Sequence, residues 1–192
     1  ANFIFIRQKG PYGNGTPVLC AKDLIGDEPF AVVWGDEFFY APKKPHIRQL
    51  IDVYETYQAP VLTACDVDDE GTKKYGIIEA DVAAGRTLRV RKLVEKPGPD
   101  ATSSRIACLG GYILTPDIFP ALEKTKPGKD KEIWLPDAIA KLIAQKPVYA
   151  QRIEGVHYDT GSKIGYLKAN VDFALRNDAL RKEFRTYLKS VL

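Results

Sequence analysis

The chain has 192 residues, which suits one domain of ordinary size. Its 45% hydrophobic and 28% charged residues are typical of a folded globular protein and exclude a disordered chain. The formal net charge of +3 is too small to favour nucleic acid or an anionic membrane as a partner, and no apolar run reaches the roughly 20 residues of a membrane helix. The three cysteines are far apart and lack metal-type spacing, which predicts reduced thiols and a cytoplasmic protein.

Apolar runs alternate with helical patterns through the first third of the chain. The expected strands are residues 3–6, 30–34 and 60–65, and the expected helices are residues 18–25 and 47–57. Apolar runs without polar alternation are typical of strands that are covered on both faces. The order strand, helix, strand, helix, strand predicts right-handed parallel crossovers. Because the sequence has no methionine and opens directly on an apolar run, we expect it to be a piece of a longer chain.

The remaining two thirds of the chain predict further strands and helices in mixed order. The expected elements are an antiparallel pair at residues 75–79 and 88–94, strands at residues 106–114 and 148–153, and helices at residues 133–145 and 164–192. The sequence shows no internal repeat, linker or low-complexity tract. It therefore predicts one mixed α/β domain over residues 1–192, with a mixed, mainly parallel sheet flanked by helices.

A glycine-rich loop follows the first expected strand. Gly10, Gly13 and Gly15 let backbone N–H groups approach a ligand closely, as phosphate or base recognition requires. A simple turn explains the same glycines equally well. Gln8, at the end of the strand, carries an amide that can both donate and accept hydrogen bonds, as the edge of a pyrimidine requires.

Two aspartates follow expected strands. Asp36 comes directly after the apolar run 30–34, and ligands of open α/β sheets bind beyond the carboxyl ends of strands. A carboxylate at this place suits Mg²⁺, or it caps the next turn. Asp159 lies in the stretch 157–161, ahead of the last expected helix, where it is either a helix cap or a second metal ligand.

The stretch Val94-Glu95-Lys96-Pro97 ends the second strand of the expected antiparallel pair. Adjacent strand residues point to opposite faces, so Glu95 and Lys96 face one site only if the strand twists or ends there. Pro97 supplies such an end because it removes a ladder donor. The alternative is a surface ion pair. Gly76, in the first strand of the pair, leaves room for a group near the backbone.

The two histidines do not make a site by themselves. His46 and His157 lack the spacing of a helical metal pair, and no nucleophile elbow supports a Ser-His-Asp triad. His46 lies beside two lysines and is expected to be exposed to solvent.

Ten short stretches in fixed order carry a resemblance to a known family. They are residues 7–8, 13–15, 18–21, 26–32, 75–78, 94–97, 110–114, 131–133, 137–139 and 157–161. In this order they resemble the bacterial UTP–glucose-1-phosphate uridylyltransferases of the sugar-phosphate nucleotidyltransferase superfamily, over essentially the whole sequence. The resemblance implies a Rossmann-like nucleotidyltransferase fold whose N-terminal strand and phosphate loop lie upstream of residue 1.

The resemblance implies transfer of a uridylyl group from UTP to α-D-glucose 1-phosphate, which gives UDP-glucose and pyrophosphate. Gln8 and the backbone of Gly13 resemble the groups that read the uracil. Asp36 resembles the catalytic carboxylate that holds Mg²⁺, and Asp159 resembles its second protein ligand. The family commonly forms dimers or tetramers, so a homo-oligomer is expected.

The same resemblance assigns the sugar phosphate to the end of the expected hairpin. Gly76 lies against the sugar, Glu95 accepts hydrogen bonds from its hydroxyls, and Lys96 is the catalytic contact to the sugar 1-phosphate. These roles suit a reaction between two polyanions, because a metal ion and a lysine reduce their repulsion.

The sequence departs from the family pattern in two places. Trp34-Gly35 stands where the family more often has Leu-Pro, and this change resembles thymidylyl-transferring relatives. Trp134 and Pro136 replace more polar residues in the segment after Glu132. The alternatives are therefore a thymidylyl- or cytidylyl-transferring relative, or a catalytically silent subunit that binds a nucleotide sugar.

Overall fold

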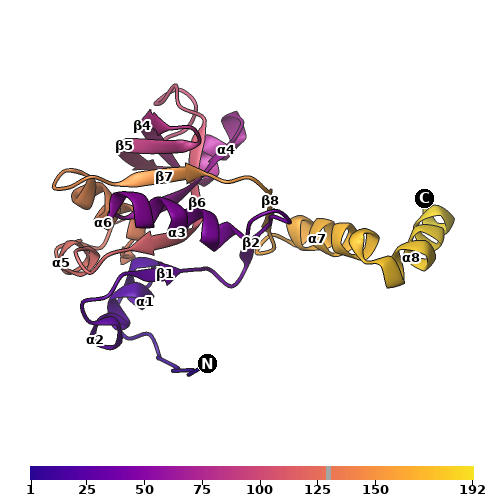
Figure 1. The fold of residues 1–192 in the computed structure, drawn as a ribbon, viewed down its shortest axis with the longest axis horizontal. Coiled ribbons are helices and arrows are strands. Elements are labelled where there is room, and N and C mark those ends of the chain that lie inside the picture. Colours follow the sequence, from indigo (N-terminus) through magenta and orange to yellow (C-terminus); the bar gives the residue numbers. More distant parts are fainter. Residues whose placement is uncertain (129–130) are drawn as a thin grey trace.

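A six-stranded mixed sheet forms the centre of the protein in a computed structural model, which describes residues 1–128 and 131–192 (Figure 1). The strands follow the order β1 (Phe30–Val32), β6 (Ile106–Leu114), β3 (Val61–Asp66), β7 (Tyr149–Arg152), β5 (Thr87–Glu95) and β4 (Gly76–Ala84). β4 returns to pair with β6 as well. The α/β class and the mixed sheet predicted from the sequence are confirmed.

The expectation of a mainly parallel sheet is wrong. Among the described residues only β3 and β7 pair in parallel, and every other pairing of the six strands is antiparallel. β1 and β3 do run in the same direction, as their helical crossover requires, but the antiparallel strand β6 lies between them. Long apolar runs indicate burial on both faces, and burial alone does not decide strand direction.

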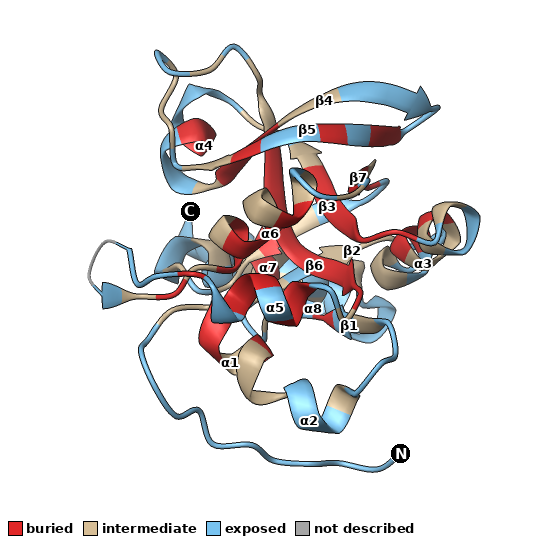
Figure 2. Ribbon diagram, turned by 90° about the vertical axis from the view of Figure 1, so that its left-hand side faces the viewer, coloured by how far each residue is buried: buried red, intermediate tan, exposed pale blue. Residues whose placement is uncertain are grey.

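Alternate side chains of the sheet pack against different helices. Along β3, Leu62 and Ala64 join the larger core with the buried sides of α1, α5 and α6, whereas Val61 joins the cluster beneath α3. Figure 2 shows this buried layer along the central strands and on the inner sides of the helices. The sheet is therefore covered on both faces, which explains the continuous apolar runs.

The helices are short except for α3 and the two at the C-terminus. Their bounds are α1 (Gly15–Cys20), α2 (Lys22–Ile25), α3 (His46–Tyr57), α4 (Asp69–Lys74), α5 (Ile118–Glu123), α6 (Leu135–Ile143), α7 (Lys163–Arg176) and α8 (Asp178–Val191). The helix expected over residues 164–192 is broken at Asn177, whose side chain accepts a hydrogen bond from the Ala179 N–H and so caps α8. α7 and α8 extend away from the body of the protein (Figure 1). No helix among the described residues is both long and apolar enough to span a bilayer.

A separate two-stranded sheet was not expected from the sequence. β2 (Glu37–Tyr40) and β8 (Val156–Asp159) pair antiparallel, with Glu37 opposite Asp159. The strand expected at residues 3–6 is wrong, because the N-terminal segment forms no strand and is exposed (Figure 2). Phe5 keeps 94% of its surface accessible. Within the described residues this segment has no neighbouring strand to bond its backbone, and an apolar run alone does not make a strand.

Candidate functional site

A cleft of about 420 Å³ opens where β2 meets the ends of β4 and β5 and the middle of β6. The cleft is lined by Asn14, Trp34, Gly35, Asp36, Glu37, Lys74, Tyr75, Gly76, Glu95, Lys96, Cys108, Leu109, Gly110, Tyr112 and Pro136. Four residues expected at the site, namely Asp36, Gly76, Glu95 and Lys96, therefore share one hollow. They come from three segments that are far apart in the sequence.

Glu95 and Lys96 both face the cleft because β5 ends between them. Lys96 has a left-handed backbone with φ of 46°, and its N–H donates to the Tyr75 carbonyl at 3.2 Å. The Lys96 Nζ lies 3.5 Å from Glu95 Oε1 and 5.0 Å from the centre of the Trp134 ring. Burial raises the pKa of the Glu95 carboxyl above its usual value, and the Lys96 ammonium opposes that shift.

Gly76 lies opposite Glu95 in the β4–β5 ladder. A Cβ at Gly76 would stand 3.1 Å from Glu95 Oε2 and 3.2 Å from the Leu93 Cδ1. Any side chain at this position would therefore enter the space beside the Glu95 carboxylate. The structure agrees with the expectation that this glycine leaves room near the backbone.

Asp36 and Asp159 approach each other at Gly161. A Cβ at Gly161 would stand 2.8 Å from Asp36 Oδ2 and 3.3 Å from Asp159 Oδ1, so the two carboxylate oxygens are separated by at most the sum of these distances. Asp159 Oδ1 also accepts hydrogen bonds from the backbone N–H groups of Gly161 and Ser162 at 3.0 and 3.3 Å. Asp159 thus both bonds the turn before α7 and stands beside Asp36, although it is outside the cleft lining.

Glu37 is a site residue that the sequence reasoning did not assign. Its Oε2 accepts a hydrogen bond from the Gly110 N–H at 3.0 Å, and its Oε1 lies 2.7 Å from His157 Nε2. The side chains of Glu37 and His157 keep only 17% and 19% of their surface exposed. Glu37 therefore ties the two-stranded sheet to β6 of the main sheet. The one signal for it in the sequence is its place directly after Asp36, as a second acidic residue beyond the apolar run 30–34.

His46 is packed against neighbouring side chains, and the expectation that it is exposed to solvent is wrong. Its Nε2 lies 2.6 Å from Thr63 Oγ1, and its ring stands 4.3 Å from the ring of Phe39. The Thr63 hydroxyl donates to the Gly111 carbonyl at 2.6 Å, so His46 Nε2 must carry the proton that is shared with Thr63. Burial lowers the pKa of His46 to about 4, so this histidine is neutral at pH 7.

Gln8 and Gly13 lie outside the cleft lining. Gln8 is exposed, and its Nε2 donates to the Pro11 carbonyl at 3.2 Å. Gly13 has φ of 108°, and a Cβ on it would stand 2.7 Å from the Ile133 nitrogen and closer still to the Ile133 carbonyl oxygen. The conformation of Gly13 is thus required by close packing against residue 133. Asn14, the next residue, does line the cleft.

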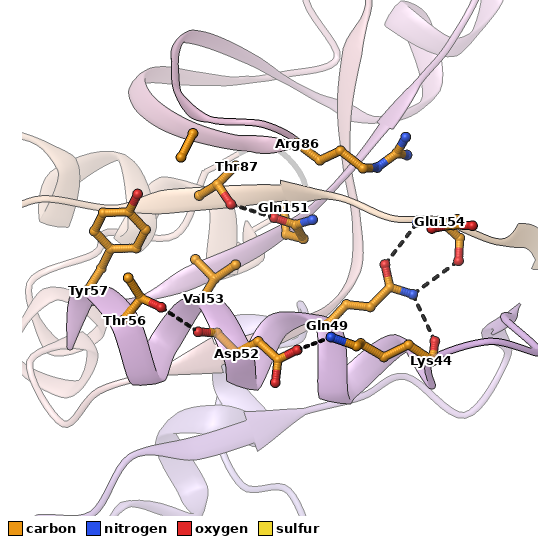
Figure 3. Close-up of a pocket in the computed structure, with 11 residues that line it drawn as sticks. Lys44, Gln49, Asp52, Val53, Thr56, Tyr57, Arg86, Thr87, Gln151 and Glu154 are labelled. Carbon is orange, nitrogen blue, oxygen red and sulfur yellow. Dashed lines mark hydrogen bonds and ion pairs between the residues drawn. The ribbon is translucent and has the colours of Figure 1, made fainter.

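A second cavity, of about 380 Å³, lies between α3 and the turn that joins β4 to β5 (Figure 3). Its polar groups are bonded to one another. Gln49 donates to the carbonyls of Lys44 and Glu154 and accepts from the Glu154 N–H, and Thr87 donates to the Gln151 side chain (Figure 3). The buried amide of Gln49 therefore holds the loop between β7 and β8 against the start of α3.

Comparison with known proteins gives one consistent result. The model of the nucleotidyl transferase family matches residues 2–175. The chain is 41% identical to UTP–glucose-1-phosphate uridylyltransferase YngB of Bacillus subtilis over 192 residues, which are 100% of this chain and 64% of the relative. It is similar to the crystal structure of a UDP-glucose pyrophosphorylase complexed with UDP-glucose, with a TM-score of 0.87 and 35% identity over 91% of this chain and 67% of that chain. It is also similar to UTP-bound UGPase from Acinetobacter baumannii, with a TM-score of 0.86 and 33% identity over 97% of this chain and 65% of that one.

Proposed function

The chain belongs to the nucleotidyl transferase family, and from this premise we propose that the protein transfers a uridylyl group from UTP to α-D-glucose 1-phosphate. The products are UDP-glucose and pyrophosphate. The chain spans 64% of the length of the YngB relative, so the activity is proposed for the full-length protein. The names of that relative and of the two similar structures support these substrates.

One observation in the structure carries the proposal. Asp36, which directly precedes β2, lines the same cleft as Glu95 and Lys96 at the end of β5. A reaction between two polyanions needs a place where cationic groups gather the phosphates and where a second set of groups orients the acceptor. The cleft provides both kinds of group.

The neighbouring carboxylates of Asp36 and Asp159 fit a divalent cation, which we propose is Mg²⁺. The donor set supports this choice, because Mg²⁺ prefers one or two carboxylates and completes its shell with phosphate oxygens and water. No cluster of three or more His, Cys, Asp or Glu side chains suited to a metal occurs in the part of the chain that the structure describes. When bound, the cation would neutralise charge on the triphosphate.

The side chains of this protein orient the acceptor and reduce its negative charge. Lys96 contacts the phosphate of glucose 1-phosphate, and Glu95 accepts hydrogen bonds from the sugar hydroxyls beside Gly76. An oxygen of the sugar phosphate attacks the α-phosphorus of UTP in line. The bond between this phosphorus and the oxygen that bridges the α- and β-phosphates breaks, and pyrophosphate leaves. No general base is required, because the attacking phosphate oxygen is already anionic.

We assign reading of the uracil to Gln8 and to the backbone of Gly13, as the family resemblance implies. The amide of Gln8 supplies the donor and the acceptor that a pyrimidine edge requires. In the structure it bonds the Pro11 carbonyl, so this role requires the Gln8 side chain to exchange that partner for the base.

The proposal is tested by release of pyrophosphate from the full-length protein with glucose 1-phosphate and, in separate reactions, UTP, dTTP or CTP. We expect release with UTP, and we expect Lys96→Ala to abolish most of it. Faster release with dTTP or CTP would contradict the uridylyl assignment. Binding of UDP-glucose without release of pyrophosphate from any nucleotide would instead identify a silent binding subunit.

A further inference from the structure

The segment after Glu132 places an aromatic ring directly on the Lys96 side chain. Lys96 Nζ stands 5.0 Å from the centre of the Trp134 ring, within the range of a cation–π interaction. The Lys96 Nζ also lies 3.5 Å from Oε1 of the Glu95 carboxylate. Because Lys96 keeps 46% of its side chain exposed, these two neighbours have to hold a long side chain that is otherwise free to move.

The glycine-rich loop explains why Trp134 stays in place. The Tyr12 carbonyl accepts from the Ile133 N–H at 2.8 Å, and the Gly15 N–H donates to the Ile133 carbonyl at 2.9 Å. Asn14 Oδ1 then accepts from the Leu135 N–H at 2.7 Å, at the start of α6. Two backbone bonds to Ile133 and one bond from the Leu135 N–H to the Asn14 side chain therefore attach the segment around Trp134 to residues 12–15.

We propose that Trp134 is a positioning residue that holds the Lys96 ammonium over the cleft, and that the loop 12–15 serves to fix Trp134. This inference rests on the proposed function. Trp134 precedes α6 in an extended conformation, with φ of −98° and ψ of 130°, so its side chain is placed by the docked loop and not by a helical turn. An indole face attracts an ammonium and leaves its hydrogen-bond donors free for a phosphate.

The first test compares Trp134→Leu with Trp134→Phe in steady-state kinetics of the full-length protein. Leucine keeps apolar bulk but has no ring, whereas phenylalanine keeps a smaller aromatic face. We expect Trp134→Leu to lower kcat/KM for glucose 1-phosphate about two- to fivefold, the range for a partly exposed contact of this kind, with the KM for UTP little changed. Trp134→Phe should recover most of the loss. Equal losses in both variants would overturn the proposal.

The second test is a double-mutant cycle that measures the affinity for UDP-glucose by calorimetry. In the Lys96→Met protein, Trp134→Leu should change the affinity less than twofold, because the contact that it removes is already lost. The same loss in both backgrounds would show that Trp134 acts through packing alone and would overturn the proposal.

A spectroscopic measurement keeps this inference separate from the proposed function. These 192 residues contain two tryptophans, so in a full-length protein with Trp34 and every tryptophan outside this sequence replaced by phenylalanine, the tryptophan emission comes from Trp134. We expect Lys96→Met to change that emission without any ligand, and glucose 1-phosphate to change it only while Lys96 is present. Unchanged emission in both cases would overturn the inference. The expected changes, in a protein that releases no pyrophosphate, would refute the proposed reaction while the role of Trp134 stands.

Discussion

Removal of the Glu37 carboxylate tests whether this side chain anchors the two-stranded sheet to the main sheet. Glu37→Ala leaves two largely buried groups without a partner, the Gly110 N–H and the His157 Nε2. Each unpaired buried group costs about 1–3 kcal/mol, and the residual exposure of 17–19% admits some water, which favours the lower end of that range. We therefore expect Glu37→Ala to lower the free energy of unfolding by about 2–3 kcal/mol.

Glu37→Gln separates hydrogen bonding from charge. The glutamine oxygen can still accept from the Gly110 N–H, and its amide keeps a polar group beside His157 Nε2, so we expect a loss of only about 1 kcal/mol. We expect kcat to fall in Glu37→Gln even though the free energy of unfolding changes little. Residue 37 is next to Asp36 in the sequence and lies opposite Asp159 across the β2–β8 pair.

Urea denaturation followed by circular dichroism measures both losses, with Glu28→Ala as the control at an exposed position. The control should stay within about 0.5 kcal/mol of the unchanged protein. If Glu37→Ala is as stable as Glu28→Ala, the Glu37 carboxylate does not anchor the two-stranded sheet to the main sheet.

Three further substitutions test the lysine, the loop and the buried histidine. Lys96→Ala should lower kcat at least about 100-fold in the pyrophosphate assay while unfolding in urea changes by less than about 0.5 kcal/mol, because the side chain is half exposed. Gly13→Ala should lower the free energy of unfolding by at least about 2 kcal/mol, because φ of 108° is unfavourable and the new Cβ would overlap the Ile133 backbone. His46 has its folded pKa lowered to about 4, so the unfolded chain binds the extra proton first. Its contribution to stability is therefore complete above pH 6.5 and is lost as the pH falls toward 4, by about 1–2 kcal/mol after a discount for partial exposure. His46→Gln, which can still donate to Thr63, should flatten this part of the curve of stability against pH.

Matched controls decide these outcomes. Lys92→Ala removes a lysine from β5, outside the cleft lining, and should leave kcat unchanged. Gly26 has φ of 60° with no atom within 4 Å of the added Cβ, so Gly26→Ala isolates backbone strain from overlap. An equal loss at Gly13 and Gly26, unchanged kcat in Lys96→Ala, or a pH curve that His46→Gln does not alter would each contradict the corresponding prediction.

The elements that the sequence predicted well are those whose pattern is local and long. The expected strand at residues 106–114 has the observed bounds of β6, and the helix expected at residues 47–57 differs from α3 by one residue. β2 and β8 have four residues each, and their pairing brings together residues about 120 positions apart. A period of two over four residues is too short a signal, and nothing local indicates a partner so distant in sequence.

The sequence predicted the site residues that a single local motif specifies. It did not predict the contacts between segments that are far apart in the sequence. Pro97 indicated that β5 ends beside Glu95 and Lys96, and the structure places both at the cleft. The contact between Lys96 and Trp134 joins two distant segments, and so does the bond from Glu37 to β6. Such contacts depend on how the two sheets and the loop 12–15 pack together, and the hydrophobic pattern of each segment carries no information about that packing.

The docking of the two sheets depends on an irregularity in β6. Its register against β3 shifts so that Leu62 faces Tyr112 and Thr63 faces Leu109, which leaves Gly110 and Gly111 out of the ladder. A Cβ on Gly110 would overlap the Glu37 carboxylate, and a Cβ on Gly111 would overlap the His46 ring. Two adjacent glycines in a bulge therefore allow β2 and the start of α3 to approach the main sheet. Because Asp36 and Glu37 line the same cleft as Glu95 and Lys96, the backbone of β6 determines how closely these groups face one another.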